Sequence, residues 1–296
     1  MYPPLWIDQP GALEKVDAAD VGEAEKSIAR SLITTGLAVV RGAHDEALCE
    51  EVVADYQRYC AENSDYVRAN LDSFGREKRL VNFHHWSDAA LQIGTNRLIK
   101  SALDFVFGLE ACVYTSLTFK YGTQQPVHRD TPHFATWPRG YFVGVWTALE
   151  PVNDSAGPLF YHPGAHRFGA DESKFMAQAR ARLPHASEKE QQWLALEMYN
   201  GEIMRISPTI SEPVRLPADV GDSVIWHPEM PHGGSPASRE MATRWSTVFH
   251  CAPASIQVHQ HETFFGHDKS VSPPARYGFR EAHGRKIAEA GGVAFM

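Results

Sequence analysis

The chain has 296 residues, 43% of them hydrophobic and 22% charged, and a formal net charge of −8 without a Lys/Arg run, which favours a globular protein and excludes an electrostatic nucleic-acid surface. The four cysteines lie far apart with no C-x-x-C pair, so neither a zinc knuckle nor a disulfide framework is expected. No apolar run approaches the ~18 residues that span a bilayer, and the start of the chain lacks the features of a signal peptide, so we expect a cytoplasmic protein without membrane contact.

Helices dominate the predicted N-terminal part of the chain. Ala24, Ile28 and Leu32 recur at helical spacing within residues 21–32, and Gly36 is the kind of residue that ends a helix. The apolar run that follows predicts a short buried strand. That strand covers residues 37–40. The same reasoning predicts helices over 45–60 and 88–107, with a strand over 80–86 between them.

The period of the pattern changes at Ala111, because apolar and polar residues alternate from there to Lys120 as they do in a half-buried strand. Short strands punctuated by Gly and Pro follow, which predicts an antiparallel sandwich or jelly roll braced by the N-terminal helices. No linker divides the chain, so we expect one domain over 1–296, with helices at about 21–108 and a β core at about 111–252. The remaining predicted elements are strands over 141–149, 159–162, 202–206, 214–216, 222–226 and 244–251, and a helical insertion over about 171–199.

The first candidate functional residues are His128 and Asp130. Side chains two apart on an extended backbone point to the same face, so this imidazole and this carboxylate can converge on one metal ion. The pair gains meaning from histidines much further along the chain, His227 and His232. Two histidines and one carboxylate on one face of a metal leave three positions open, which suits ferrous iron that binds a bidentate cosubstrate and O2.

Arg244 and Ser246 lie on the predicted strand that follows the second histidine segment. A guanidinium and a hydroxyl two residues apart point the same way and can hold the distal carboxylate of a dicarboxylic acid. Arg239 is a rival for this role, although it lies in a predicted loop. The pattern therefore predicts a carboxylate clamp close to the metal.

These motifs resemble the phytanoyl-CoA dioxygenase family of iron(II)/2-oxoglutarate oxygenases. The resemblance covers most of residues 25–252 and is carried by ITTGLAVVRG at 33–42, GPLFYHPGAHR at 157–167, the His-Arg-Asp motif, His232-Gly233-Gly234 and Arg244. It implies a double-stranded β-helix, the cupin-like form of the jelly roll. Ala165 departs from the family, which usually has Ser in this turn, and we expect a changed hydrogen bond there without a change in chemistry.

The resemblance implies roles for residues at matching positions, with Fe(II), 2-oxoglutarate and O2 as the reaction partners. The small-molecule substrate is left open, and residues that follow the His-x-Asp motif are expected to form its pocket. The implied roles are as follows: His128, Asp130 and His232 bind iron; Arg244, Ser246, Thr118 and Trp146 bind 2-oxoglutarate; Thr131, His133, Phe134 and Trp137 line the substrate pocket, with His227 beside the metal site.

His232 is preferred to His227 as the third ligand because Gly233 and Gly234 leave room beside the metal. The distance from His232 to Arg244 also agrees with the family. Pro228 directly after His227 instead marks the end of a strand.

The intact carboxylate of Asp130 predicts oxygen transfer, because related halogenases have a small residue at this position. We therefore expect hydroxylation, or another oxidation, of a small molecule with release of succinate and CO2. Two alternatives remain at this point. One is a jelly-roll hydrolase or isomerase with zinc or manganese in the same triad, and the other is a binding module that has lost catalysis. The Arg244 clamp argues against the first, and the complete ligand set argues against the second.

Overall fold

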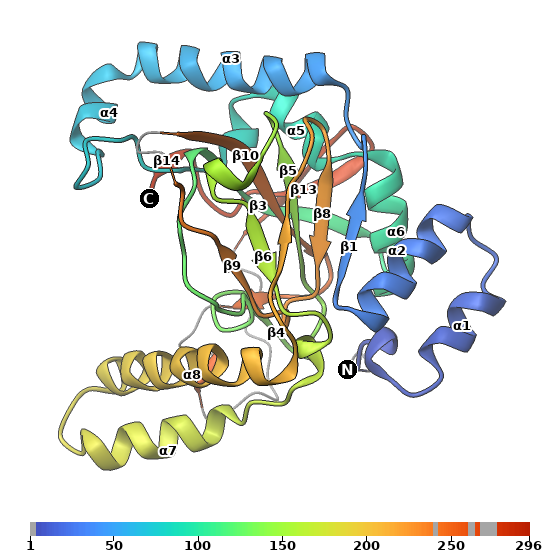
Figure 1. Cartoon of the computed structure of the whole chain (residues 1–296), viewed down its shortest axis with the longest axis vertical. Helices are drawn as coiled ribbons and strands as arrows, with labels where there is room; N and C mark the ends of the chain where they lie inside the picture. Colours follow the sequence, from blue (N-terminus) through green and yellow to red (C-terminus); the bar gives the residue numbers. More distant parts are fainter. Residues whose placement is uncertain (1–3, 239–241, 260–263, 267–276) are drawn as a thin grey trace.

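The computed structural model describes residues 4–238, 242–259, 264–266 and 277–296. It has a mainly β architecture in which a large mixed sheet faces a small antiparallel sheet, with helices packed outside (Figure 1). This is the jelly roll expected from the alternating strands, with flanking helices. Among the residues that the structure describes, no helix is both long and apolar enough to cross a membrane.

The large sheet carries the central strands of the fold. Its hydrogen-bonded order is β1-β8-β5-β10-β3-β13-β12, with β2 paired to β3 and β14 paired to β2. All of these pairs are antiparallel except β13 with β3. The strands are β1 (Leu37–Val40), β2 (Leu80–Val81), β3 (Ala111–Tyr121), β5 (Val143–Ala148), β8 (Ser223–Trp226), β10 (Thr243–Pro253), β12 (Phe279–Ala282), β13 (Arg285–Ala288) and β14 (Ala294–Phe295).

The small sheet covers one face of the large one and has the order β7-β6-β9. It consists of β6 (Leu159–Tyr161), β7 (Val214–Leu216) and β9 (His232–Gly234), and a separate pair joins β4 (Ala135–Thr136) to β11 (Val258–His259). The side chains between the two sheets form an apolar cluster that includes Trp146, Trp226 and Val248. This cluster surrounds the inner end of the candidate site.

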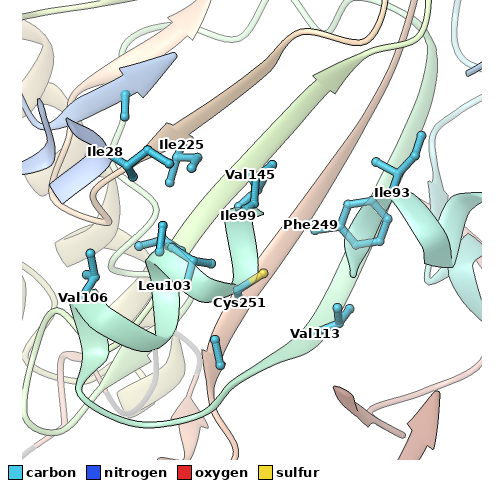
Figure 2. Close-up of a cluster of buried hydrophobic side chains, with 14 of the residues drawn as sticks. Ile28, Ile93, Ile99, Leu103, Val106, Val113, Val145, Ile225, Phe249 and Cys251 are labelled. Carbon is cyan, nitrogen blue, oxygen red and sulfur yellow. The ribbon is translucent and has the colours of Figure 1, made fainter. Parts of the chain in front are cut away.

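The other face of the large sheet is covered by the N-terminal helices, which bury the largest apolar cluster of the described residues. Figure 2 shows Ile99 beside Val145 of the sheet, and Phe249 of the sheet beside Ile93. These helices and the short ones beside them are η1 (Trp6–Asp8), α1 (Ala12–Ala18), α2 (Glu23–Thr34), α3 (Glu46–Glu62), α4 (Ser64–Ala69), η2 (Phe83–His85), α5 (Asp88–Gly94) and α6 (Arg97–Phe107).

Two predictions for this part of the chain are wrong in detail. The helix expected over 88–107 is broken at Asn96, whose side chain accepts a hydrogen bond from the Ile99 N–H and starts α6 as a separate helix. The strand expected over 80–86 ends at Val81, because Asn82 adopts a left-handed conformation with φ 57°. The helix ended by Gly36 and the strand Leu37–Val40 are confirmed.

The helical insertion is longer than predicted. It contains α7 (Glu172–Arg182) and α8 (Glu188–Ile210), which lie side by side at the end of the molecule opposite α3 (Figure 1). The strand expected over 202–206 is therefore wrong, since these residues continue α8. Ile203 and Ser207 are buried four residues apart, and Glu202 pairs with Arg205 along the helix surface. Five residues are too few for the spacing of apolar side chains to distinguish a helix from a strand. Two further short 3-10 turns, η3 (Asp154–Ala156) and η4 (Ala165–Arg167), flank β6.

Candidate metal and cosubstrate site

His128, Asp130 and His232 come together where the two sheets meet. One ligand atom from each lies within 4.8 Å of the others, and they are the one such His/Cys/Asp/Glu group found among the described residues. His128 and His232 are backbone partners: each N–H donates to the other's carbonyl oxygen at 3.0 Å. Opposed residues of an antiparallel bridge face the same side, so the pairing places both imidazoles together. Their ring centroids lie 4.5 Å apart.

The other polar atoms of these three residues bond to the surrounding protein. The Nδ1 atoms of His128 and His232 lie 2.9 Å from the carbonyl oxygens of Pro126 and Met230. Each Nδ1 must then carry the proton, which leaves the Nε2 lone pair free to bind a metal. The indole of Trp226 donates to Oδ2 of Asp130 at 2.7 Å, so Oδ1 is left for the metal.

Burial sets the protonation of this site. It lowers the pKa of His128 to about 4, with a smaller contribution in the same direction from His232. Burial also opposes ionisation of Asp130, but the neighbouring His232, His250 and His128 and the Trp226 hydrogen bond together hold the pKa of Asp130 below its usual value. Neutral imidazoles and an ionised carboxylate are the forms that bind a divalent metal.

Arg129, between the first two ligands, points away from them and is 1% exposed. Its guanidinium donates to Glu229 at 3.0 Å and to the carbonyl oxygens of Ala165 and Phe168 at 2.9 and 2.7 Å. Glu229 belongs to the segment that leads into His232. The Arg129–Glu229 pair therefore ties the two ligand-bearing segments together on the side opposite the metal.

A pocket with a cavity volume of about 80 Å³ opens beside the three ligands. Its lining combines apolar walls from both sheets with two arginines and a third histidine. The lining residues are Arg79, Leu117, Phe119, Thr123, Gln125, His128, Asp130, Trp146, Leu159, Trp226, His232, Gly233, Gly234, Arg244, Val248 and His250.

Arg244 lies at this pocket, as the sequence predicts, and is 3% exposed. One of its terminal nitrogens donates to the carbonyl oxygen of Gly157 at 2.7 Å, whereas its Nε has no hydrogen-bond partner in the described structure. Burial lowers the pKa of Arg244 to about 10, so the group remains a cation at neutral pH. A Cβ on Gly122 would lie 3.1 Å from the guanidinium carbon, so a larger residue there would press on the Arg244 side chain.

Of the other residues predicted to bind 2-oxoglutarate, Trp146 lines the pocket, whereas Thr118 and Ser246 do not. Trp146 lines the pocket, and its indole nitrogen has no hydrogen-bond partner in the described structure. Thr118 lies on the opposite face of β3, where its hydroxyl bonds to that of Thr247 at 3.1 Å, because alternation along the strand puts Leu117 at the pocket instead. The Ser246 hydroxyl donates to the Arg244 carbonyl oxygen and does not line the pocket. Arg239 lies outside the described residues.

The residues that follow the His-x-Asp motif do not line this pocket. The N–H groups of His133 and Phe134 both bond to the Asp130 carbonyl oxygen, so the chain turns sharply after the ligand. The Thr131 hydroxyl donates to the Pro228 carbonyl oxygen. Phe134 packs against His250, with the ring centroids 4.2 Å apart and the rings tilted, and so supports the pocket from behind. Trp137 packs against the helical insertion.

His227 follows the end of β8 and points away from the metal ligands, toward Asp8 and His166. Its Nε2 is 3.3 Å from Asp8, and its ring faces that of His166 at 5.5 Å. Its Nδ1 accepts the backbone N–H of Glu229. His227 therefore joins the N-terminal segment to the segment that carries His232, and His232 is the histidine that the structure brings to the site.

Sequence reasoning missed three residues that border the metal ligands. Arg79 precedes β2, and its Nε is buried without a hydrogen-bond partner in the described structure. His250 is two residues beyond Val248 on β10, and burial lowers its pKa to about 4. Trp226 fixes Asp130. The alternation of β10 could have indicated His250, but Arg79 had no signal because its strand is only two residues long.

Comparison with known proteins identifies the family of the chain. The family model for phytanoyl-CoA dioxygenase (PhyH) matches residues 34–242 of the chain. The chain belongs to the phytanoyl-CoA dioxygenase family. The mouse peroxisomal phytanoyl-CoA dioxygenase is 30% identical over 114 residues, which are 38% of this chain and 29% of that protein. The match thus spans less than a third of the length of this relative.

Solved structures share the fold of this family member at low sequence identity. The epimerase SnoN from nogalamycin biosynthesis aligns with a TM-score of 0.58 and 17% identity, over 95% of this chain and 96% of that one. EctD from S. alaskensis, solved with 2-oxoglutarate and 5-hydroxyectoine, aligns with a TM-score of 0.60 and 14% identity, over 92% and 89% of the two chains. The carbocyclase SnoK aligns with a TM-score of 0.59. These alignments establish the jelly-roll fold.

The donor set of this phytanoyl-CoA dioxygenase family member fits ferrous iron. Two imidazoles and one carboxylate converge from one side, with their outer atoms already bonded to Pro126, Met230 and Trp226. The unpartnered guanidinium nitrogen of Arg244 lies in the same pocket, where a dicarboxylate cosubstrate would satisfy it.

Proposed function

We propose that the chain acts as a single oxygenase domain that hydroxylates a small molecule, using Fe(II), 2-oxoglutarate and O2 and releasing succinate and CO2. The observation that carries this proposal is the combination of the His128/Asp130/His232 group with the buried cation of Arg244 in one pocket. Iron bound there supplies the oxidative decarboxylation of 2-oxoglutarate and the oxidising power that attacks a substrate C–H bond.

The protein residues prepare this chemistry by fixing geometry. The backbone carbonyls of Pro126 and Met230 hold the imidazoles in the tautomer that presents Nε2. The Trp226 indole holds Asp130 so that one carboxylate oxygen faces the histidines, with Oδ1 3.7 and 3.9 Å from the two Nε2 atoms. Apolar walls such as Leu117 exclude water, which strengthens the electrostatic interactions inside the pocket.

In this proposal Arg244 and Arg79 provide two positive charges for the two carboxylates of the cosubstrate. Arg244 pairs with the distal carboxylate, because its guanidinium is buried, cationic and incompletely hydrogen-bonded. Arg79, which also lines the pocket, supplies the second positive charge; burial lowers its pKa, and the nearby Asp130 carboxylate opposes part of that shift. A dianionic cosubstrate neutralises both groups. A metal-dependent hydrolase or isomerase has no need of two buried cations beside its metal, which argues against that alternative.

The test is a screen of small-molecule pools for substrate-stimulated turnover of 2-oxoglutarate by the iron-loaded protein. Coupled O2 uptake and succinate release are expected with the substrate present, and His232→Ala is the matched inactive control. Metal-dependent product formation without O2 uptake or succinate release would support a hydrolase or isomerase instead.

Mass spectrometry of the product then tests the reaction type. Hydroxylation adds one oxygen atom to the substrate. The fold neighbours include proteins described as an epimerase and a carbocyclase, so the alternative outcomes are an unchanged formula or a loss of two hydrogen atoms. Either of these would leave the oxygenase class in place and overturn hydroxylation.

A further inference from the structure

Lys100 is unusually deeply buried for a lysine. It lies in α6 on the helix-covered face of the large sheet and is 1% exposed. Lysine is almost never fully buried unless it is paired. No carboxylate forms an ion pair with Lys100 in the part of the chain that the structure describes; its polar contact is the thiol of Cys251.

The Lys100 amine and the Cys251 thiol are unusually close. Nζ lies 2.7 Å from Sγ, which is the short end of the range of ~2.7–3.2 Å for N–H···O bonds, although sulfur is the larger atom. A direct N–S bond would be much shorter than this distance, whereas one oxygen atom bonded to both would hold them at about this separation. A neutral amine beside a thiol carries no net charge, and it still carries none when the proton moves from sulfur to nitrogen.

The surroundings isolate this pair from other reaction partners. Cys251 is 0% exposed and projects from β10 among Ile99, Leu103 and other apolar side chains (Figure 2). Cys112 is similarly buried on the neighbouring strand, but it pairs with Ala252 rather than Cys251 and therefore faces the opposite side of the sheet. Lys100 is thus the nucleophile that Cys251 faces, and Cys112 provides an equally buried thiol without an amine partner.

We propose that Lys100 and Cys251 form a covalent oxidation site, in which hydrogen peroxide joins Nζ to Sγ through a single oxygen atom. This inference does not depend on the proposed substrate reaction. The crosslink ties α6 to β10, the strand that carries Arg244 and His250 to the pocket. It closes a loop from residue 100 to residue 251, and long closed loops give the largest loss of entropy in the unfolded chain.

Two equivalents of hydrogen peroxide balance the step. Lys100 takes the thiol proton, the thiolate attacks one peroxide to give a sulfenic acid, and Lys100 returns the proton to the departing hydroxide, which leaves as water. The second peroxide oxidises the free amine to a hydroxylamine and also releases water. The hydroxylamine oxygen then bonds to sulfur and expels the sulfenic hydroxyl as a third water. Sulfur and nitrogen each lose two electrons, and the protein gains one oxygen atom and loses two hydrogen atoms.

The experiment uses the full-length protein, with a chelator present so that iron chemistry does not contribute. After hydrogen peroxide treatment, peptide mass spectrometry should find the Lys100 and Cys251 peptides joined, with one added oxygen and two hydrogens lost. A thiol reductant should separate them. The melting temperature should rise by several degrees on oxidation and return on reduction.

Three variants separate the possible outcomes. Cys112→Ser should retain the crosslink, whereas Cys251→Ala and Lys100→Met should each abolish it. If a variant folds poorly, the peptides of the protein without substitutions, compared before and after hydrogen peroxide treatment, still decide the question. Oxidation of Cys251 to a sulfinic acid with Lys100 free, a disulfide with Cys112, a direct N–S bond without added oxygen, or no change at either residue would each overturn the proposal.

Discussion

The two faces of β10 are both buried, yet they hold different kinds of side chain. Toward the helices the strand presents Trp245, Phe249 and Cys251, which belong to the largest apolar cluster. Toward the small sheet it presents Arg244 and His250, each with a buried nitrogen that has no hydrogen-bond partner in the described structure. Unpaired buried polar atoms cost stability. The helix-covered face thus has the side chains of a protein core, whereas the pocket face offers buried polar groups that a bound cosubstrate would pair with.

Loss of a metal ligand should have the largest effect on the pocket face. His232→Ala removes one of the converging Nε2 atoms, so the ferrous-iron affinity should fall by more than about two decades, beyond the range seen for residues that only support ligands. His227→Ala is the matched control because His227 faces Asp8, and it should lose about one decade or less. Anaerobic titration with Fe(II) measures both. The reverse order would assign the triad to the other histidine.

A cavity on the helix-covered face should affect stability alone. Leu103 is 0% exposed, so Leu103→Ala should lower the free energy of unfolding by ~2–5 kcal/mol. Leu13→Ala on α1, where the side chain is 39% exposed, should change it by about 0.5 kcal/mol or less. Denaturant titration gives both values. If folded Leu103→Ala also bound iron tenfold more weakly, the two faces would not be separable in this way.

Removal of the clamp should weaken cosubstrate binding and leave the metal in place. Arg244→Ala removes a charge-assisted pair worth ~1.5–3 kcal/mol, so the 2-oxoglutarate affinity should fall by roughly one to two decades with unchanged iron affinity. Arg205→Ala, on the exposed side of α8, should bind 2-oxoglutarate normally. Isothermal calorimetry on the metal-loaded protein decides the matter. Unchanged affinity in Arg244→Ala would move the clamp to another residue, with Arg79 the first to examine.

The smallest effect should come from the hydrogen bond behind Asp130. Trp226→Phe keeps most of the ring but removes the N–H donor, so iron affinity should fall by about tenfold. That donor helps to hold the Asp130 pKa below its usual value; its loss raises the pKa. Protons compete with metal for the carboxylate, so iron binding should begin to fail at a higher pH as the solution is acidified. Trp193→Phe, on the exposed side of α8, should leave this pH profile unchanged.

Much of the site could be predicted because its residues obey local rules. His128 and Asp130 are two apart on an extended segment, and Arg244 follows the glycine pair after His232. These spacings survive in any fold that keeps the segments extended. The alternation of β3 and the end of α2 at Gly36 were predicted for the same reason, since each depends on neighbouring residues alone.

The sequence by itself thus determined the fold class, the family and the three residues that converge as candidate metal ligands. The tertiary structure decided which faces meet. It turned Thr118 away from the pocket, led the chain away from the metal after Asp130, and brought in Arg79 and His250. Local patterns fix the period of a strand or helix. The neighbours of each face depend on strand pairing between residues as distant as His128 and His232, and that pairing is set by the packing of the whole core.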